Sequence, residues 1–169
     1  MEANMNRYVM MLTAVALSMA ASSAYGDEIQ CRITGELMDA SVPVDAFSGG
    51  IIGSYEPASG LPTGKRQHRP ATILKKLDAL SPALFQAAVT NRTLAAVECS
   101  FYRNAPRKTK QLYYRITLTQ PRIVDLSVSG AGPTDTVARE TVQFVYHKIT
   151  LEDVLTGTVA EDFWEIPES

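Results

Sequence analysis

The side chains that could do chemistry in this 169-residue chain are few. There are two histidines: His68 lies in a basic stretch, which favours a solvated side chain, and His147 lies in an alternating stretch, which favours the surface of a sheet. No serine stands in the Gly-x-Ser-x-Gly turn of many hydrolases, and the glycine-rich runs lack the lysine of a phosphate-binding loop. We therefore expect no catalytic residue, no cofactor and no enzymatic activity.

The two cysteines are the remaining reactive side chains. Cys31 and Cys99 each alternate with apolar residues two positions away, so both are predicted to point into the core. They are a candidate disulfide if their strands are neighbours or face each other across the fold, and two small buried hydrophobic side chains otherwise. Two cysteines alone make a poor zinc site, so we expect no bound metal.

The first 26 residues have the pattern of a secretory signal peptide. Arg7 supplies a positive charge, residues 9–21 are almost wholly apolar, and small residues precede a cleavage site between Gly26 and Asp27. No other long apolar run follows, so after cleavage we expect a soluble, secreted or periplasmic protein that does not associate with a membrane. A translation start at Met19 would instead remove the signal and leave the protein in the cytoplasm.

Charge is distributed unevenly along the chain. The formal net charge of −2 argues against a general nucleic-acid binder. Residues 65–110 hold ten basic residues and two acids, whereas residues 150–169 hold six acids and no base. In an isolated domain these would be solvated segments of opposite sign. The residues that could form opposite faces in an assembly are the basic Lys65, Arg66, His68 and Arg69 and the acidic Glu161, Asp162 and Glu165.

Hydrophobic patterning predicts one mainly β domain over residues 27–169. Strands are predicted over residues 27–36, 42–54, 71–77, 94–103 and 139–151, with a long exposed loop over residues 55–70. Residues 111–129 are predicted to form either a pair of strands or one bent strand. Ser81 is expected to cap one short helix, with Pro82 in its first turn and an apolar face that includes Leu84 and Phe85. This order of elements predicts an antiparallel β-barrel or pair of sheets with one short flanking α-helix.

Several short motifs follow one another in a fixed order. The helix is preceded by Lys75 and Asp78 and begins with Ser81 and Pro82, in the pattern Lys-x-x-Asp-x-x-Ser-Pro. The later motifs are Phe101-Tyr102-Arg103, Tyr113-Tyr114, Val128-Ser129, Glu140-Thr141-Val142, Tyr146-His147-Lys148-Ile149 and the tail from Gly157 to Glu165. This ordered set resembles the haemolysin-coregulated protein (Hcp) family, and the resemblance covers essentially residues 27–169.

The resemblance implies a structural subunit of the type VI secretion tube. It implies hexameric rings with a wide lumen, which stack into a tube inside a contractile sheath and deliver effectors. The expected partners are other copies of the chain and the sheath, spike and effector proteins. The loop over residues 55–70 would help the rings to stack.

Two other functions stay open. Family members assemble in the cytoplasm and usually lack a cleaved signal, so this chain could be an exported Hcp-like ring or adaptor that binds a protein partner outside the sheath. It could also be a small periplasmic hydrolase or inhibitor. In stacked rings, Lys65 and Arg66 would face Glu161 and Asp162 of the next ring, and salt would weaken this contact because exposed charges are screened over about 8–10 Å.

Overall fold

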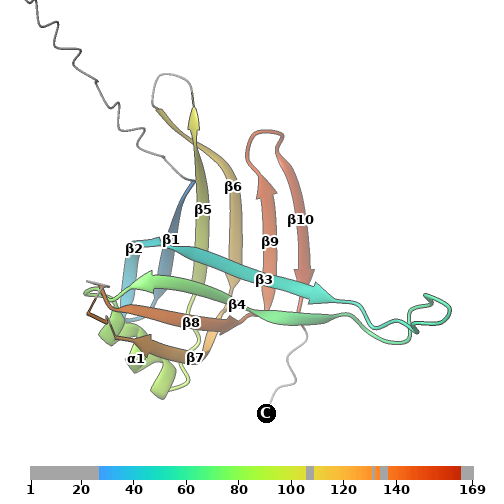
Figure 1. Cartoon of the computed structure of the whole chain (residues 1–169), viewed down its shortest axis with the longest axis horizontal. Coiled ribbons are helices and arrows are strands. Elements are labelled where there is room, and N and C mark those ends of the chain that lie inside the picture. The colour runs from blue at the N-terminus through green and yellow to red at the C-terminus, as the bar shows by residue number, and fades with distance from the viewer. Residues whose placement is uncertain (1–26, 106–108, 131, 134–136, 165–169) are drawn as a thin grey trace, which may run out of the picture.

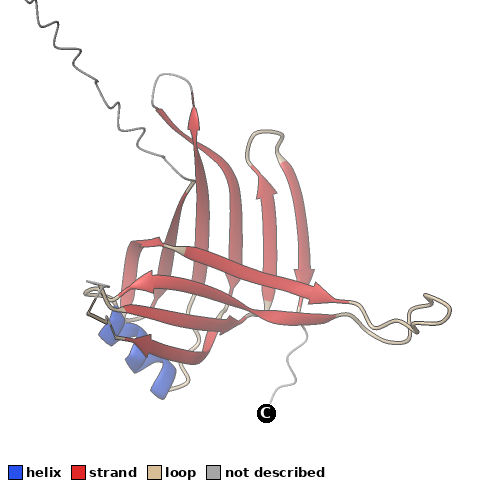
Figure 2. Ribbon diagram, viewed as in Figure 1, coloured by secondary structure: helices blue, strands red, loops and turns tan. Residues whose placement is uncertain are grey.

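The computed structural model describes residues 27–105, 109–130, 132–133 and 137–164. They form two antiparallel sheets, and the strands of one sheet run across those of the other (Figures 1 and 2). The six-stranded sheet has the order β10 (Thr158–Phe163), β9 (Lys148–Asp153), β6 (Thr109–Thr119), β5 (Ala96–Ala105), β1 (Glu28–Gly35) and β2 (Met38–Val44). The four-stranded sheet has the order β3 (Ala46–Ile52), β4 (Gln67–Lys76), β8 (Arg139–Val145) and β7 (Arg122–Ser129). One helix in this described part, α1 (Ser81–Val89), packs against β7. Two antiparallel sheets with one short flanking helix are the fold class expected from the sequence, which is confirmed.

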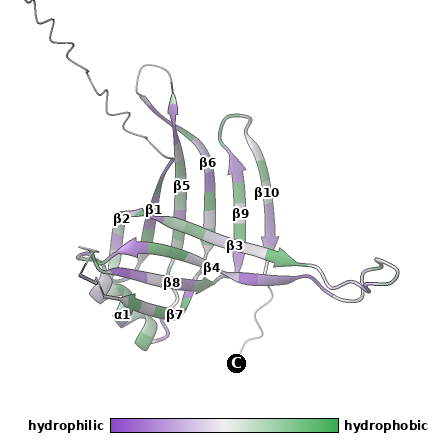
Figure 3. Ribbon diagram, viewed as in Figure 1, coloured by the Kyte–Doolittle hydropathy of each residue, from purple (hydrophilic) through white to green (hydrophobic). Residues whose placement is uncertain are grey.

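Side chains between the two sheets form the core. Every second residue of β1, β5 and β8 points inward, and Ile33, Val97 and Phe144 are fully buried. Hydrophobic and hydrophilic residues therefore alternate along the ribbons of these strands (Figure 3). Full burial of one such side chain contributes about 1.5–3 kcal/mol to folding.

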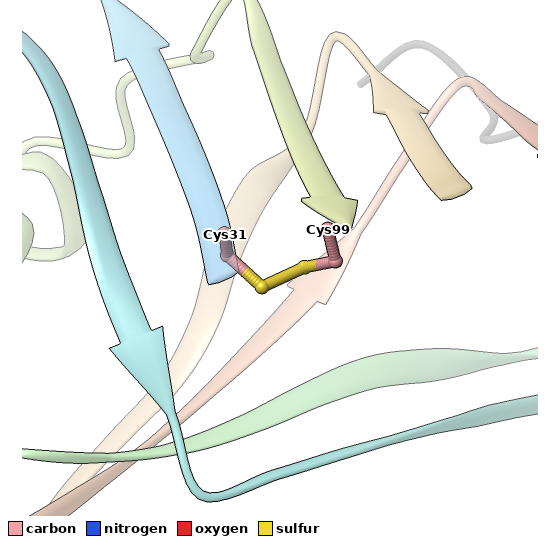
Figure 4. The surroundings of a disulfide bond; sticks show 2 residues. All are labelled: Cys31 and Cys99. Atoms are coloured by element: carbon pink, nitrogen blue, oxygen red, sulfur yellow. A yellow bond between two sulfur atoms is a disulfide. The ribbon is translucent and has the colours of Figure 1, made fainter. Parts of the chain in front are cut away.

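A disulfide joins the neighbouring strands β1 and β5. Cys31 and Cys99 lie directly opposite each other in the pairing, with their Cα atoms 4.0 Å apart and their sulfur atoms bonded at 2.02 Å (Figure 4). Both residues are 0% exposed, as expected from their alternation with apolar neighbours. The bond links residues 68 positions apart in the chain. Because it lies in the core, a reductant reaches the bond only when the two strands open.

Helix α1 forms where the sequence predicts it, but its first turn and its buried face differ from the expectation. The N-cap residue is Leu80, and no side chain caps the helix. Leu84 and Ala87 are buried, whereas Phe85 is 57% exposed. The hydroxyl of Ser81 is instead engaged by residues outside the helix, which is why it does not serve as the cap.

The residues around the start of α1 form a buried polar network. The ammonium group of Lys75 on β4 lies 2.6 Å from Glu140 on β8 and 2.9 Å from Asp78. The side chains of Lys75 and Glu140 are 0% and 1% exposed. Ser81 donates a hydrogen bond to the Glu140 carboxylate at 2.7 Å and accepts one from the Asp78 N–H at 3.0 Å. The Lys-x-x-Asp-x-x-Ser-Pro motif therefore meets the Glu140-Thr141-Val142 motif in the folded chain. Their contacts fix the beginning of α1 to the four-stranded sheet.

The predicted strand over residues 139–151 is in fact two strands in different sheets. β8 ends at Val145 and β9 begins at Lys148, and the chain passes from the four-stranded to the six-stranded sheet between them. At this point the N–H of His147 donates to the carbonyl of Thr119 at the end of β6. The alternation changes phase at this point: Tyr146 is the last buried residue before the break and Ile149 is the first after it, so the buried positions shift from even to odd numbers.

Three further boundaries differ from the sequence prediction. The strand predicted over residues 42–54 is two strands, β2 and β3, which belong to different sheets. Strand β4 begins at Gln67, so the loop predicted over residues 55–70 ends four residues earlier than expected. The acidic tail contains strand β10, which pairs with β9 at the edge of the six-stranded sheet and was not predicted. Its composition hides the strand, because every residue of β10 except Asp162 is exposed and no alternation of apolar residues marks it.

The buried network gives a stability prediction. Lys75→Met leaves the Glu140 carboxylate buried without its ammonium partner, so we expect the free energy of unfolding to fall by about 3–5 kcal/mol in urea titrations. The matched control is Arg32→Met, which removes a pair with Asp39 whose side chains are 59% and 58% exposed, and should cost less than about 1 kcal/mol. Adding Glu140→Met to Lys75→Met should recover most of the loss. Equal costs for the two single variants would contradict the role of the network.

Candidate functional site

Neither a cluster of candidate metal ligands nor a helix that could span a membrane is found among the described residues. No group of three or more histidine, cysteine, aspartate or glutamate side chains gathers among them. Within the same residues, no helix has the length and apolar character needed to cross a membrane. The features that stand out are an extended hairpin and a polar cluster at its base.

The extended hairpin, here called the arm, comprises residues 53–66 between β3 and β4. It projects far from the two sheets (Figure 1). Hydrogen bonds cross it from the Thr63 N–H to the Ser54 carbonyl at 3.0 Å and from the Glu56 N–H to the Leu61 carbonyl at 2.9 Å. Gly60 takes a φ of +69° at the turn, which glycine adopts without steric cost. The arm therefore has internal order of its own.

The arm exposes large apolar side chains. Tyr55 is 65% exposed and Leu61 is 62% exposed, and Ile51 and Ile52 at the end of β3 are 50% and 42% exposed. Exposed apolar groups that lie close together on a projecting segment are typical of a surface that contacts another macromolecule.

The polar cluster at the base of the arm, here called the clasp, comprises Arg66, His68, Tyr146, Asp162 and Trp164. Arg66 donates two hydrogen bonds to the two carboxylate oxygens of Asp162 on β10. His68 Nε2 lies 2.9 Å from Oδ2 of the same carboxylate, and His68 Nδ1 lies 3.2 Å from the Tyr146 hydroxyl. The clasp therefore links the first residues of β4 to the last strand of the other sheet.

Aromatic rings complete the clasp. The indole of Trp164 stacks on the His68 ring, with centroids 5.5 Å apart and an interplanar angle of 20°. The Tyr146 ring meets the same indole edge to face at 5.2 Å. The side chain of His68 is 3% exposed, so the two rings and the carboxylate hold it away from water.

The clasp corrects part of the sequence prediction. His68, expected to be solvated in a basic loop, is buried in β4, because its ring packs between Tyr146, Trp164 and the Asp162 carboxylate. Arg66 and Asp162, expected to meet between rings, pair within one subunit.

The other predicted stacking residues have separate positions. Lys65 lies in the arm and Arg69 lies on β4, and both side chains are exposed. Glu161 pairs with Lys148 at 3.2 Å. Glu165, like the signal sequence up to Gly26, lies outside the described residues, whereas Asp27 is exposed just before β1. A contact of Lys65, Arg69, Glu161 or Glu165 with another ring stays a prediction.

Sequence reasoning missed Tyr146 and Trp164 as parts of this site. Both stand in the family-like motifs, the first before the change of sheet and the second at the end of the tail. Their pairing with His68 joins positions 78 or more residues apart, which periodicity cannot reveal. The one available sign was an isolated tryptophan in an acidic tail.

Comparison with known proteins decides the family. The sequence profile of the family described as "Type VI secretion system effector, Hcp" matches residues 25–152. The chain is 30% identical over 163 residues to the "Major exported protein" of Pseudomonas aeruginosa, covering 94% of this chain and 95% of that protein. This chain belongs to the Hcp family.

Solved Hcp structures have the same fold. A structure titled "Crystal structure of Hcp protein" aligns with a TM-score of 0.77 at 19% identity, over 81% of this chain and 99% of that one. The "Secreted protein Hcp3 from Pseudomonas aeruginosa" aligns with a TM-score of 0.68 at 25% identity, over 83% and 100%. The chain is therefore a subunit of the type VI secretion tube, in a family of structural proteins that form hexameric rings.

The clasp makes a prediction about pH. Hydrogen bonds from Arg66 lower the pKa of Asp162 from 3.8 to about 2, with smaller contributions from the Phe163 N–H and from His68. Because the folded-state pKa is the lower one, the contribution to stability is present above about pH 4 and is lost as the pH falls towards 2. The NMR shift of the Asp162 carboxyl carbon should titrate with a midpoint of about 2, and Arg66→Gln should raise that midpoint. A midpoint near 3.8 in the unmodified protein would contradict the paired geometry.

Proposed function

We propose that the mature chain, residues 27–169, forms hexameric rings and that the arm joins each ring to the next in a tube through which effector proteins pass. The observation that carries this proposal is the arm itself, which combines internal hydrogen bonds with the exposed side chains of Tyr55 and Leu61. A segment that is ordered before binding loses less conformational entropy when it docks. Membership of the Hcp family supports the ring and the tube.

The position of the arm favours stacking over a closed pair of subunits. It leaves the two sheets at one end of the molecule, away from α1 and β7 (Figure 1). A contact between the arm of one copy and a different surface of another is heterologous, and such contacts propagate from copy to copy. Repeated around a ring, the same contact adds one ring to the next.

As a second candidate, which excludes assembly of the tube in the cytoplasm, we propose that the chain is exported by its N-terminal signal and cleaved between Gly26 and Asp27. The first strand, β1, begins at Glu28, so the proposed mature chain would start one residue before the folded domain. The Pseudomonas aeruginosa relative is an exported protein by its name. The buried Cys31–Cys99 bond supports the same route, because disulfides persist in oxidising compartments. An exported chain would form its ring outside the sheath, and the partner would be a protein met there.

The arm can be tested by substitution. Tyr55→Ser/Leu61→Ser removes two apolar side chains whose burial in a ring-to-ring contact would contribute about 1.5–3 kcal/mol each. We expect hexamers of unchanged mass by light scattering but few stacked rings by electron microscopy. Thr63→Ala, which alters the arm without removing an apolar group, is the control and should stack as the unmodified protein does. Stacking that survives the double substitution would contradict the proposed role of the arm.

The route of export is tested separately. Mass spectrometry of the protein recovered from the native cell should show an N-terminus at Asp27 and a mass lower by two hydrogens than that of the dithiol. Lys65→Gln is a suitable control variant, because it leaves both the signal and the cysteines intact. Recovery of the intact N-terminus with two free thiols would instead assign assembly to the cytoplasm and reject the exported route.

A further inference from the structure

We propose that Asp162 is a positioning residue that sets the direction of the arm, so that strand β10 of each subunit controls the contact that its arm makes with another copy. This inference rests on the proposed stacking function of the arm. In this proposal, Asp162 orients the arm for its contact with another copy but does not itself touch that copy.

The Asp162 carboxylate holds the arm at its junction with the body of the protein. Arg66 is the last residue of the arm, and its guanidinium binds both carboxylate oxygens. A two-point contact of this kind fixes the orientation of the guanidinium as well as its distance, which a single lysine ammonium cannot do. His68, two residues further along, lies on the same carboxylate at 2.9 Å. One side chain therefore holds the residues on both sides of Gln67.

The carboxylate is itself fixed to the rest of the molecule. β10 pairs with β9 along its length, and Asp162 lies opposite Ile149 in that pairing. The Asp162 side chain is 20% exposed, whereas its neighbours Glu161 and Phe163 lie on the exposed side of the strand. The His68 ring is enclosed by Tyr146 and Trp164. The base of the arm thus rests on packed side chains from both sheets.

The other side of the arm continues from β3. This strand pairs with β4 up to Ile52, which lies opposite Gln67, and the pairing shifts register between Ser48 and Gly50. Gly53 follows the last paired residue, and a Cβ added there would meet nothing within 4 Å. Glycine in open space allows a wide range of backbone angles. The contact between Arg66 and Asp162 therefore adds a second attachment at the base of the arm, beside the β3–β4 pairing.

The length of the arm makes small rotations at its base important. The six residues from Leu61 to Arg66, at about 3.3 Å each, place the start of the turn roughly 20 Å from the base of the arm. A rotation of about 10° at the base then moves the tip by about 3–4 Å, which is comparable to the separation at which apolar atoms make contact at all. Loss of the clasp would move Tyr55 and Leu61 out of register with their receiving surface while leaving them exposed.

The experiment compares two carboxylates that an arginine binds at two points. Asp162→Asn removes the charge and one of the two acceptor oxygens, and Arg66→Lys keeps the charge but removes the two-point contact. Asp39→Asn is the matched control, because it disrupts a two-point pair with Arg32 that does not involve the arm. We expect Asp162→Asn and Arg66→Lys to form hexamers, and to need at least tenfold more protein than Asp39→Asn to form stacked rings.

A second measurement does not depend on stacking. In dispersed hexamers, amide hydrogen exchange at the base of the arm, at Gln67 and His68, should be at least tenfold faster in Asp162→Asn than in Asp39→Asn, with exchange at Thr63 within the arm and in β4 from Ala71 onward unchanged. Equal exchange in the two variants, or equal stacking, overturns the positioning role. Absence of stacking in the unmodified protein, with the exchange difference present, rejects the stacking function but keeps the role of Asp162 in holding the arm.

Discussion

The arrangement of the four-stranded sheet and the helix depends on one buried charge. An ammonium group without contact to water costs several kcal/mol unless it is surrounded by acceptors, so Lys75 requires Glu140, Asp78 and a carbonyl group in place. Meeting that requirement brings β4 and β8 into one register and fixes the turn before α1. Apolar packing alone would tolerate a helix that starts a residue earlier or later. The polar network specifies one position, and the order of the family motifs along the chain reflects that shared geometry.

Much of this fold could be predicted from the sequence, and the exceptions have physical reasons. β1, β5 and α1 lie where the period of apolar residues places them, because each buries one face against the core. The division between β8 and β9 was missed although the alternation shifts by one residue between Tyr146 and Ile149, because a bulge within a single strand produces the same shift. His68 was misplaced because the charge of its neighbours indicates an exposed segment, while the ring itself is enclosed by groups 78 and 94 residues away.

The uneven distribution of charge has a different use from the one that composition suggests. Opposite charges on one chain can pair within a subunit or between subunits, and pairing within the subunit carries no cost of association. Arg66 and Asp162 pair in this way, and Lys148 and Glu161 pair across β9 and β10. These contacts hold the subunit together. Under the proposed stacking function, the exposed apolar side chains of the arm act in addition to any contact that the charged residues make with another ring.

The disulfide bears on where such a ring can form, because its oxidation state is set at the time of folding. Cys31 and Cys99 have no exposed surface, so neither an oxidant nor a reductant acts on them while β1 and β5 remain paired. A subunit folded in a reducing cytoplasm would keep two buried thiols, which pack as small hydrophobic side chains and leave the fold intact. A subunit folded outside it would carry the bond, through every later step of assembly. The oxidation state of Cys31 and Cys99 therefore reports the compartment in which β1 first paired with β5. Free thiols would indicate a ring built inside the sheath, and a disulfide would indicate one built outside it.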